Sequence, residues 1–321
     1  MTSPNNPDPS APLEAGEGRA GTSRLDGWLV IDKPQGMTSA RAVALVKRAT
    51  GGAKVGHAGT LDPLATGVLP LALGEATKTV RCLGVCRKHY RFRIRWGAAT
   101  DTDDSEGTVV AETDARPDVA AIVAALPAFV GTIRQRPPAY SAIKLGGKRA
   151  YALARAGKPP ELAPRSVDIH ALTLLAVPRP APDHAEFEAV VGEGTYIRSL
   201  ARDLATALGT LGHIVALRRT AVGRFSETQA ISLDSAVALG HSLAASEHLL
   251  PIETALDDIP ALAVTAEEAA RLRHGQKVVP HGASGDQIAE GALVGARHDR
   301  LLVALARAEA GCLRPVRIIN R

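Results

Sequence analysis

The stretch from Gly56 to Pro70 has the composition of a loop that presents one reactive group. It places a single carboxylate, Asp62, among glycines, prolines and small residues. Glycine admits backbone conformations closed to other residues, and Pro63 disfavours a helical conformation at Asp62. Such a loop can hold a side chain still while a substrate approaches its backbone. An isolated aspartate is more often a turn residue or a cap, so a catalytic role depends on the rest of the chain.

A second candidate is Arg198, which lies near the end of a glycine-rich turn at residues 192–199 and near the start of the helix that follows. A helix is predicted over residues 199–208, with Leu200, Leu204 and Leu208 on one face. A guanidinium near a helix start meets the positive end of the helix dipole, which is unfavourable unless an anion lies opposite. Arg198 is therefore either a surface arginine or the ion-pair partner of a carboxylate from elsewhere.

The segment from residue 131 to residue 160 is strongly basic. It contains seven Lys and Arg residues and neither Asp nor Glu, and its tyrosines Tyr140 and Tyr151 lie among the cations. Cations that pair with phosphates and rings that stack on bases are typical of a nucleic-acid clamp. The alternative is a solvated basic loop and helix, and we favour the clamp.

Strands and helices around these groups are predicted from hydrophobic periodicity. Strands are expected at residues 27–32, 90–96, 167–176 and 185–191, and helices at residues 76–83, 119–130 and 231–256. In the strand at 90–96, aromatic and aliphatic residues alternate with three arginines, which predicts one buried face and one solvated basic face. Ser39 is the expected N-cap of a helix to about Ala49, with Val43 and Val46 inward.

The whole chain sets broad limits. Its 321 residues carry 38 Lys and Arg against 33 Asp and Glu, a net charge of +5 that mildly favours a polyanionic partner. No apolar run approaches the roughly 20 residues needed to cross a bilayer, and the N-terminus lacks the basic and then apolar layout of a signal peptide. The three cysteines form no CxxC pair, so a reducing cytoplasm is expected. Residues 1–24 are predicted to be a disordered tail. Beyond about residue 259, short strands and Gly/Pro turns predict a small β-rich unit.

Metal and cofactor sites are not indicated. The acidic turn at residues 101–107 faintly resembles a calcium loop, but Glu106 takes the place that needs glycine. There is no Walker loop, no HExxH motif and no paired-cysteine site.

Five linked motifs together resemble the bacterial tRNA pseudouridine-55 synthases of the TruB family. They are, in the family's order, residues 32–39 (DKPQGMTS), 56–70 (GHAGTLDPLATGVLP), 88–90 (KHY), 135–144 (QRPPAYSAIK) and 194–200 (GTYIRSL). The similarity runs from about residue 25 to residue 230. The C-terminal part resembles the family's PUA domain more loosely, and residues 1–24 have no recognised counterpart.

The resemblance implies an α+β fold. A pseudouridine-synthase core, with a central mixed or antiparallel sheet flanked by helices, would span residues 25–256 and include a thumb insertion at 131–160. A PUA-like RNA-binding domain would span residues 257–321. The implied substrate is the T-arm and T-loop of tRNA, bound by a monomer without an obligatory protein partner, and no cofactor is implied.

The resemblance also implies roles for single residues. Asp62 would attack the target uridine at C1′ of the sugar or C6 of the base, a choice that the sequence leaves open. Arg198 would be its counterion, and Tyr90 would stack on the flipped uracil. RNA or substrate contacts would come from these residues: Lys33, His57, Tyr140, Lys144, Lys148, Arg149, Arg155 and Leu200. Without the resemblance, Tyr90 reads as a strand residue, His57 as structural and Lys33 as a solvated loop cation.

Three alternatives compete with this interpretation. A guide-dependent relative that works in a ribonucleoprotein is disfavoured by the bacterial-type thumb and the lack of long basic tails. A non-catalytic RNA-binding or RNA-folding protein would not need Asp62, Tyr90 and Arg198 together. A glycosidase-like enzyme would normally need a second acid beside the first, and none is present in the Asp62 motif.

Overall fold

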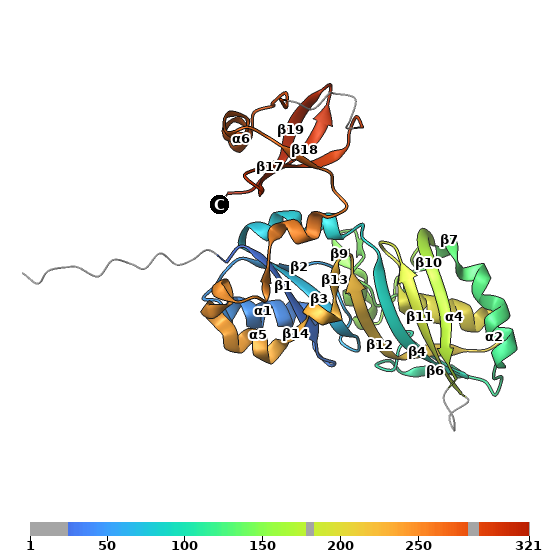
Figure 1. The fold of residues 1–321 in the computed structure, drawn as a ribbon. Helices are drawn as coiled ribbons and strands as arrows, with labels where there is room; N and C mark the ends of the chain where they lie inside the picture. The colour runs from blue at the N-terminus through green and yellow to red at the C-terminus, as the bar shows by residue number, and fades with distance from the viewer. Residues whose placement is uncertain (1–24, 178–182, 282–288, 321) are drawn as a thin grey trace, which may run out of the picture.

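A large mixed sheet forms the centre of the molecule (Figure 1). The computed structural model describes residues 25–177, 183–281 and 289–320; the tail predicted at residues 1–24 lies outside them. The strand order is β14-β1-β3-β12-β4-β11-β10-β7, and β12 runs parallel to β3 but antiparallel to β4. These strands are β1 Gly27–Lys33, β3 Thr66–Leu73, β4 Lys88–Trp96, β7 Gly131–Gln135, β10 Arg165–Ala176, β11 His184–Val191, β12 Gly212–Val222 and β14 Ile231–Ser232. Short strands β2 Val55–His57, β13 Phe225–Ser226 and β15 Leu249–Leu250 pair alongside.

Both faces of the sheet are covered at β1, whose sequence is a continuous apolar run. Leu29 and Ile31 pack toward the helices α1 Ser39–Ala49 and α5 Leu233–Leu239. Trp28 and Val30 pack toward two 3₁₀ segments, η1 Gly74–Leu83 and η5 Ile252–Leu256. A strand buried on both faces is expected to lack polar alternation, which explains why this strand could be located from sequence.

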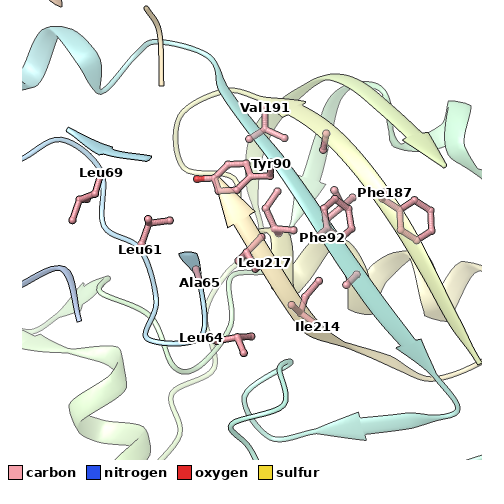
Figure 2. Close-up of a cluster of buried hydrophobic side chains, with 14 of the residues drawn as sticks. Leu61, Leu64, Ala65, Leu69, Tyr90, Phe92, Phe187, Val191, Ile214 and Leu217 are labelled. Carbon is pink, nitrogen blue, oxygen red and sulfur yellow. The ribbon is translucent and has the colours of Figure 1, made fainter. Parts of the chain in front are cut away.

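Strand β4 crosses the middle of the sheet and confirms the predicted alternation. Its four aromatic and aliphatic residues are buried, and the side chains of its three arginines point the other way. Figure 2 shows part of the core that the buried face builds with Phe187, Ile214 and Leu217. The basic face is not merely solvated, because acidic residues of or beside β11 pair with all three arginines, in the pairs Arg91–Glu188, Arg93–Glu186 and Arg95–Asp183.

The remaining elements of the large unit correct several expectations. The helix predicted at 119–130 is α2 Val119–Ala125 followed by the 3₁₀ turn η2 Leu126–Phe129, because Pro127 cannot continue the backbone hydrogen bonds. The segment at 76–83 is a 3₁₀ helix, and 231–256 is not one helix but a series of short elements that includes η4 Gly240–Ala245. The other short elements are β5 Ala98–Thr100, β6 Val109–Glu112, β8 Lys144–Leu145, β9 Lys148–Arg149, α3 Ala150–Arg155, α4 Ile197–Ala207 and η3 Glu227–Gln229.

A small β-rich unit follows at the C-terminal end (Figure 1). It holds a four-stranded sheet of β16 Ala261–Ala263, β17 Leu293–His298, β18 Leu301–Glu309 and β19 Cys312–Ile318, with helix α6 Ala266–Arg273. The unit has its own apolar core and contacts the large unit through Leu302, Leu305 and Ile319. We propose a domain boundary near residue 257, where the chain leaves η5. None of the helices in the described part of the chain is long and apolar enough to cross a membrane.

Candidate active site

The loop that carries Asp62 is held by its neighbours on both sides. Leu61 and Leu64 are buried, whereas 36% of the Asp62 side chain is exposed. Ser39 Oγ accepts a hydrogen bond from the Leu61 N–H at 2.9 Å and donates one to the Leu61 carbonyl at 3.0 Å. Ser39 is therefore not the N-cap that the sequence suggested: Thr38 caps α1, and Ser39 fixes the residue before Asp62.

Lys33 fixes the residue after Asp62. Its side chain is fully buried, and Nζ donates to the carbonyls of Pro34 at 2.8 Å, Met37 at 2.7 Å and Pro63 at 3.4 Å. Burial lowers the pKa of Lys33 to about 8, and the nearby negative charge of Asp62 opposes this shift. Lys33 is thus not a solvated loop cation, and its contacts join the DKPQGM loop to the Asp62 loop.

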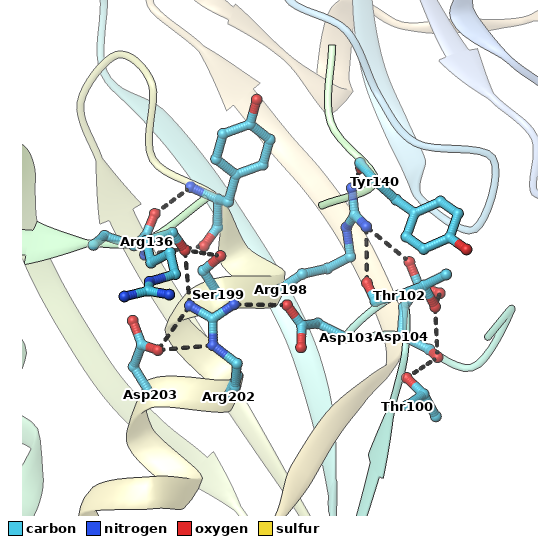
Figure 3. A network of polar contacts seen from close by, with 12 residues as sticks. Thr100, Thr102, Asp103, Asp104, Arg136, Tyr140, Arg198, Ser199, Arg202 and Asp203 are labelled. Carbon is cyan, nitrogen blue, oxygen red and sulfur yellow. Dashed lines mark hydrogen bonds and ion pairs between the residues drawn. The ribbon is translucent and has the colours of Figure 1, made fainter. Parts of the chain in front are cut away.

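Arg198 lies in the first turn of α4 and is 4% exposed. Its Nη2 lies 2.9 Å from Asp62 Oδ2 and donates to the Tyr140 carbonyl at 2.9 Å, while Nη1 donates to the Thr102 carbonyl at 2.9 Å. Figure 3 shows this side chain reaching from α4 toward Tyr140 and Thr102. The guanidinium therefore joins three segments that are far apart in sequence, and it faces a carboxylate as the unfavourable helix-start position suggested.

A second carboxylate, Asp104, completes the arginine site and was missed from sequence. It is 3% exposed, and its Oδ2 lies 3.5 Å from Arg198 Nη1. Its Oδ1 accepts from Thr102 Oγ1 at 2.6 Å and from the Glu106 N–H at 3.0 Å. In sequence, the acidic turn at 101–107 resembles only a metal loop, but the same turn can supply the anion that an arginine at a helix start lacks.

Tyr90 lies beside the same loop. It is 7% exposed, at the end of the buried face of β4, and Figure 2 shows its hydroxyl end directed toward the segment with Leu61 and Leu69. Leu200, predicted to line the pocket, is fully buried in the same core and presents no surface to a substrate in this conformation.

His57 precedes the loop, on the short strand β2. Burial lowers the pKa of His57, and the positive charge of Arg219 lowers it further. Its Nδ1 is buried and has no hydrogen-bond partner among the described residues. Because its pKa is lowered below the ordinary value of 6.5, the partly buried His57 ring is uncharged at neutral pH, although a backbone hydrogen bond with Gly59 opposes the shift.

The base of the thumb segment is attached to the site. The Gln135 side chain bonds the backbone of Tyr196 twice, at 3.2 and 2.9 Å, and the Arg136 carbonyl accepts from Ser199 Oγ and from Arg202 Nη2 (Figure 3). Arg202 Nη1 also lies 2.9 Å from Asp103 Oδ2. These contacts, which the sequence did not indicate, fix where the segment leaves the sheet.

The outer part of the thumb segment is exposed and positively charged. Tyr140, at its base, is half-buried, and its hydroxyl lies 3.4 Å from Asp101 Oδ2. Lys144, Lys148, Arg149 and Arg155 are exposed, and no carboxylate of the described residues forms an ion pair with them. Arg149 and Arg155 lie over the Tyr151 ring at 6.0 and 5.7 Å. Unpaired surface cations around a half-exposed ring are available to phosphates and bases.

The geometry supports chemistry at the Asp62 carboxylate. A second exposed carboxyl, Glu106, lies near it: burial raises the pKa of Glu106, and the negative charges of Asp104 and Asp62 raise it further. Asp62 faces a buried guanidinium, so a positive charge lies 2.9 Å from the carboxylate oxygen that a nucleophile would use. Asp104 is buried and pairs with Arg198. Within residues 25–177, 183–281 and 289–320, no group of three or more His, Cys, Asp and Glu side chains could hold a metal ion.

Comparison with known proteins shows which sequences and folds this chain is similar to. Residues 47–197 match the model of the TruB family pseudouridylate synthase N-terminal domain, and residues 198–257 match the tRNA pseudouridylate synthase B C-terminal domain. The match ends before the four-stranded sheet. The chain is 52% identical to proteins named tRNA pseudouridine synthase B from Bradyrhizobium diazoefficiens, over 98% of this chain and 92% of that one, and from Rhodospirillum rubrum, over 92% and 97%.

Two solved structures have a similar fold. A Cbf5-Nop10-Gar1 complex matches with a TM-score of 0.68 and 28% identity, over 89% of this chain and 79% of that chain. A structure of an H/ACA RNP bound to a substrate RNA containing 2′-deoxyuridine matches with a TM-score of 0.71 and 24% identity, over 92% and 86%. These similarities confirm the predicted class of fold, a mixed central sheet with helices and a small C-terminal sheet.

Proposed function

The chain belongs to the TruB family of pseudouridylate synthases, and on this premise we propose that it converts the T-loop uridine at position 55 of tRNA to pseudouridine, with Asp62 as the nucleophile. Family membership supports the coarser statement, an isomerisation of uridine to pseudouridine in tRNA. The observation that supports Asp62 as the nucleophile is its pair with Arg198 at 2.9 Å, in which the carboxylate is accessible and the guanidinium is not.

The reaction rearranges one glycosidic bond and leaves the atoms of the nucleotide unchanged. The Asp62 carboxylate adds to C1′ of the ribose or to C6 of the uracil; the N1–C1′ bond breaks, the uracil turns, and a C5–C1′ bond forms. C5 then loses its proton, N1 gains one, and the carboxylate is released. Arg198 would orient Asp62, and Tyr90 would stack on the uracil and stand near C5.

The RNA must present an extruded base, because Asp62 cannot reach a stacked one. Flipping costs a few kcal/mol, which stacking and phosphate contacts offset. In this proposal, the exposed cations of the thumb segment bind the T-arm, His57 contacts the RNA beside the extruded base, and the small C-terminal unit extends the contact surface. The protein would act alone on tRNA.

The proposal is tested with purified protein and an unmodified tRNA transcript, by mapping pseudouridine at single-nucleotide resolution. We expect product at the T-loop uridine with wild-type protein. Asp62→Asn should form none, while its affinity for the transcript stays within about threefold, because the change removes the nucleophile and not the cationic surface.

Three outcomes would count against it. Product elsewhere in the tRNA would contradict the assigned position. Tight binding without product would favour the RNA-binding alternative. Turnover by Asp62→Asn would contradict the role of Asp62.

A further inference from the structure

We infer that Arg219 is a positioning residue for this reaction, which fixes both ends of the loop that carries Asp62. The inference rests on the proposed function, since it concerns how that loop is held. Arg219 lies on β12 and is 1% exposed. Nothing in the sequence distinguished it from Arg218, the arginine beside it.

The side chain of Arg219 bonds the loop on either side of Asp62. Nε donates to the Val68 carbonyl at 2.8 Å, and Nη2 donates to the Gly59 carbonyl at 3.0 Å. Gly59 precedes Asp62 by three residues and Val68 follows it by six, so one planar guanidinium spans the loop. A planar fork of donors loses less freedom for each bond it forms than a flexible ammonium would.

The backbone of Arg219 makes a second connection. In the sheet, Arg219 pairs with Gly67 of β3 on one side and with Tyr90 of β4 on the other. The approach to β3 is so close that a Cβ on Gly67 would lie 2.2 Å from the Arg219 carbonyl oxygen. A single residue therefore lies between the end of the Asp62 loop and Tyr90, the two parts that must meet the same uracil.

Arg219 and Arg218 differ in their ion pairs. Arg218 is half-buried and pairs with Asp32 and Glu227. Arg219 is buried, and its guanidinium forms no ion pair with any carboxylate in the described ranges. Burying a cation without a counterion is costly, and neutral donors could tie strands together at less cost. After burial itself, the charge of Arg219 also lowers the pKa of His57 and of Lys88. Arg219 thus fixes the loop and helps to keep the adjoining His57 uncharged.

The test compares Arg219→Met with Arg218→Met, a matched change on the same strand. Single-turnover rates of pseudouridine formation are measured at saturating tRNA transcript, together with the dissociation constant. Arg219→Met should slow the reaction about 100-fold, because small displacements of a reacting group cost that much, while the dissociation constant stays within about threefold. Arg218→Met should leave both near wild type.

A folding defect is separated from a positioning defect by two further measurements. Circular dichroism gives the folded fraction of each variant. Arg219→Lys keeps the positive charge but lacks the planar guanidinium whose donors bond two carbonyls. Arg219→Lys should fold and still react at least about tenfold slower than wild type. Free guanidinium added to Arg219→Ala should restore part of the rate, and ethylammonium should not.

The outcomes distinguish this inference from the proposed function. If wild-type protein forms no T-loop product, the proposed function fails. If wild type does form it, and Arg219→Lys matches its rate, or the loss in Arg219→Met equals its unfolded fraction, only the role of Arg219 is overturned.

Discussion

The Asp62 loop and the base of the thumb segment meet at Arg198, whose Nη2 contacts both Asp62 and the Tyr140 carbonyl, but the polar side chains of the loop and of the outer thumb differ in burial and in their partners. Around the loop, Lys33, Ser39 and Arg219 are buried, and each bonds backbone carbonyls. Along the thumb, Lys148 and Arg149 are exposed and carry no ion pair with a described carboxylate. A buried polar group bonded to the backbone limits where a loop can go, whereas an exposed cation is free to meet phosphate. We therefore expect changes near the loop to reduce rate and changes in the thumb to reduce affinity.

Apart from the loss of Asp62 itself, the largest effect is expected from Arg198→Met, which removes the guanidinium that contacts both Asp62 and the Tyr140 carbonyl. The single-turnover rate should fall about 10² to 10³-fold, as for loss of a preorganised charged donor. Asp104 would be left buried without its cation, so urea unfolding should show a loss of about 3 kcal/mol or more. Arg202→Met, which leaves Asp62 paired, should affect the rate much less; an equal loss would contradict the central position of Arg198.

Gly67→Ala should come next, because it separates the end of the loop from β12. Gly67 has φ +99°, and its Cβ would lie 2.2 Å from the Arg219 carbonyl oxygen. The backbone strain and the overlap of the new Cβ should together lower the free energy of unfolding by on the order of 3 kcal/mol, measured by urea unfolding. The single-turnover rate of the folded fraction should fall as well. Gly52→Ala is the control, because Gly52 has φ +89° but nothing within 4 Å of its Cβ position; it should cost about 1 kcal/mol and leave the rate unchanged.

Lys33 should make the loop sensitive to pH. Its pKa is lowered to about 8, first by burial, so the group loses its charge as pH rises through 8. The rate at saturating tRNA should then fall with pH, because an uncharged amine has one donor fewer for the three carbonyls. Lys33→Met should be slower at pH 7 and nearly independent of pH between 7 and 9. A wild-type rate that stays flat over this range would exclude the role.

The same group has a defined effect on stability. Its pKa is lower in the folded protein than the ordinary value of 10.5, so between about pH 8 and 10.5 the unfolded chain binds more protons. Its contribution to the free energy of unfolding should therefore rise with pH across that window. Comparing wild type with Lys33→Met by urea unfolding isolates this contribution.

The smallest effect is expected in the thumb. Changing Lys148 and Arg149 together to Gln should weaken tRNA binding about three- to tenfold and reduce the slope of log affinity against log salt by about 1.4 to 1.8, since each phosphate contact contributes about 0.7 to 0.9. The rate at saturation should not change. Lys47 and Arg48, an exposed Lys-Arg pair at the end of α1, provide the control, and their double Gln variant should bind like wild type. An unchanged salt slope in the thumb variant would argue against the clamp.

The sequence predicted what local patterns encode. Strand β4 follows from alternation, and β1 from an unbroken apolar run. Arg198 was singled out because its position at a helix start called for an anion. Long-range backbone contacts have no such pattern: Ser39 looked like a cap but bonds Leu61, and Arg219 looked like Arg218. Asp104 has no local signal either. The acidic turn resembles a metal loop, and the partner of Asp104, Arg198, lies 94 positions later in the chain.

The most direct test of the account is to measure saturated rate and tRNA affinity side by side for Asp62→Asn and for the Lys148/Arg149 double Gln variant. The account predicts a crossed result: Asp62→Asn binds like wild type and forms no T-loop pseudouridine, while the thumb variant binds more weakly and reacts at the wild-type rate once saturated. If both variants lose rate and affinity in the same proportion, the division between a fixed catalytic loop and a binding thumb is wrong.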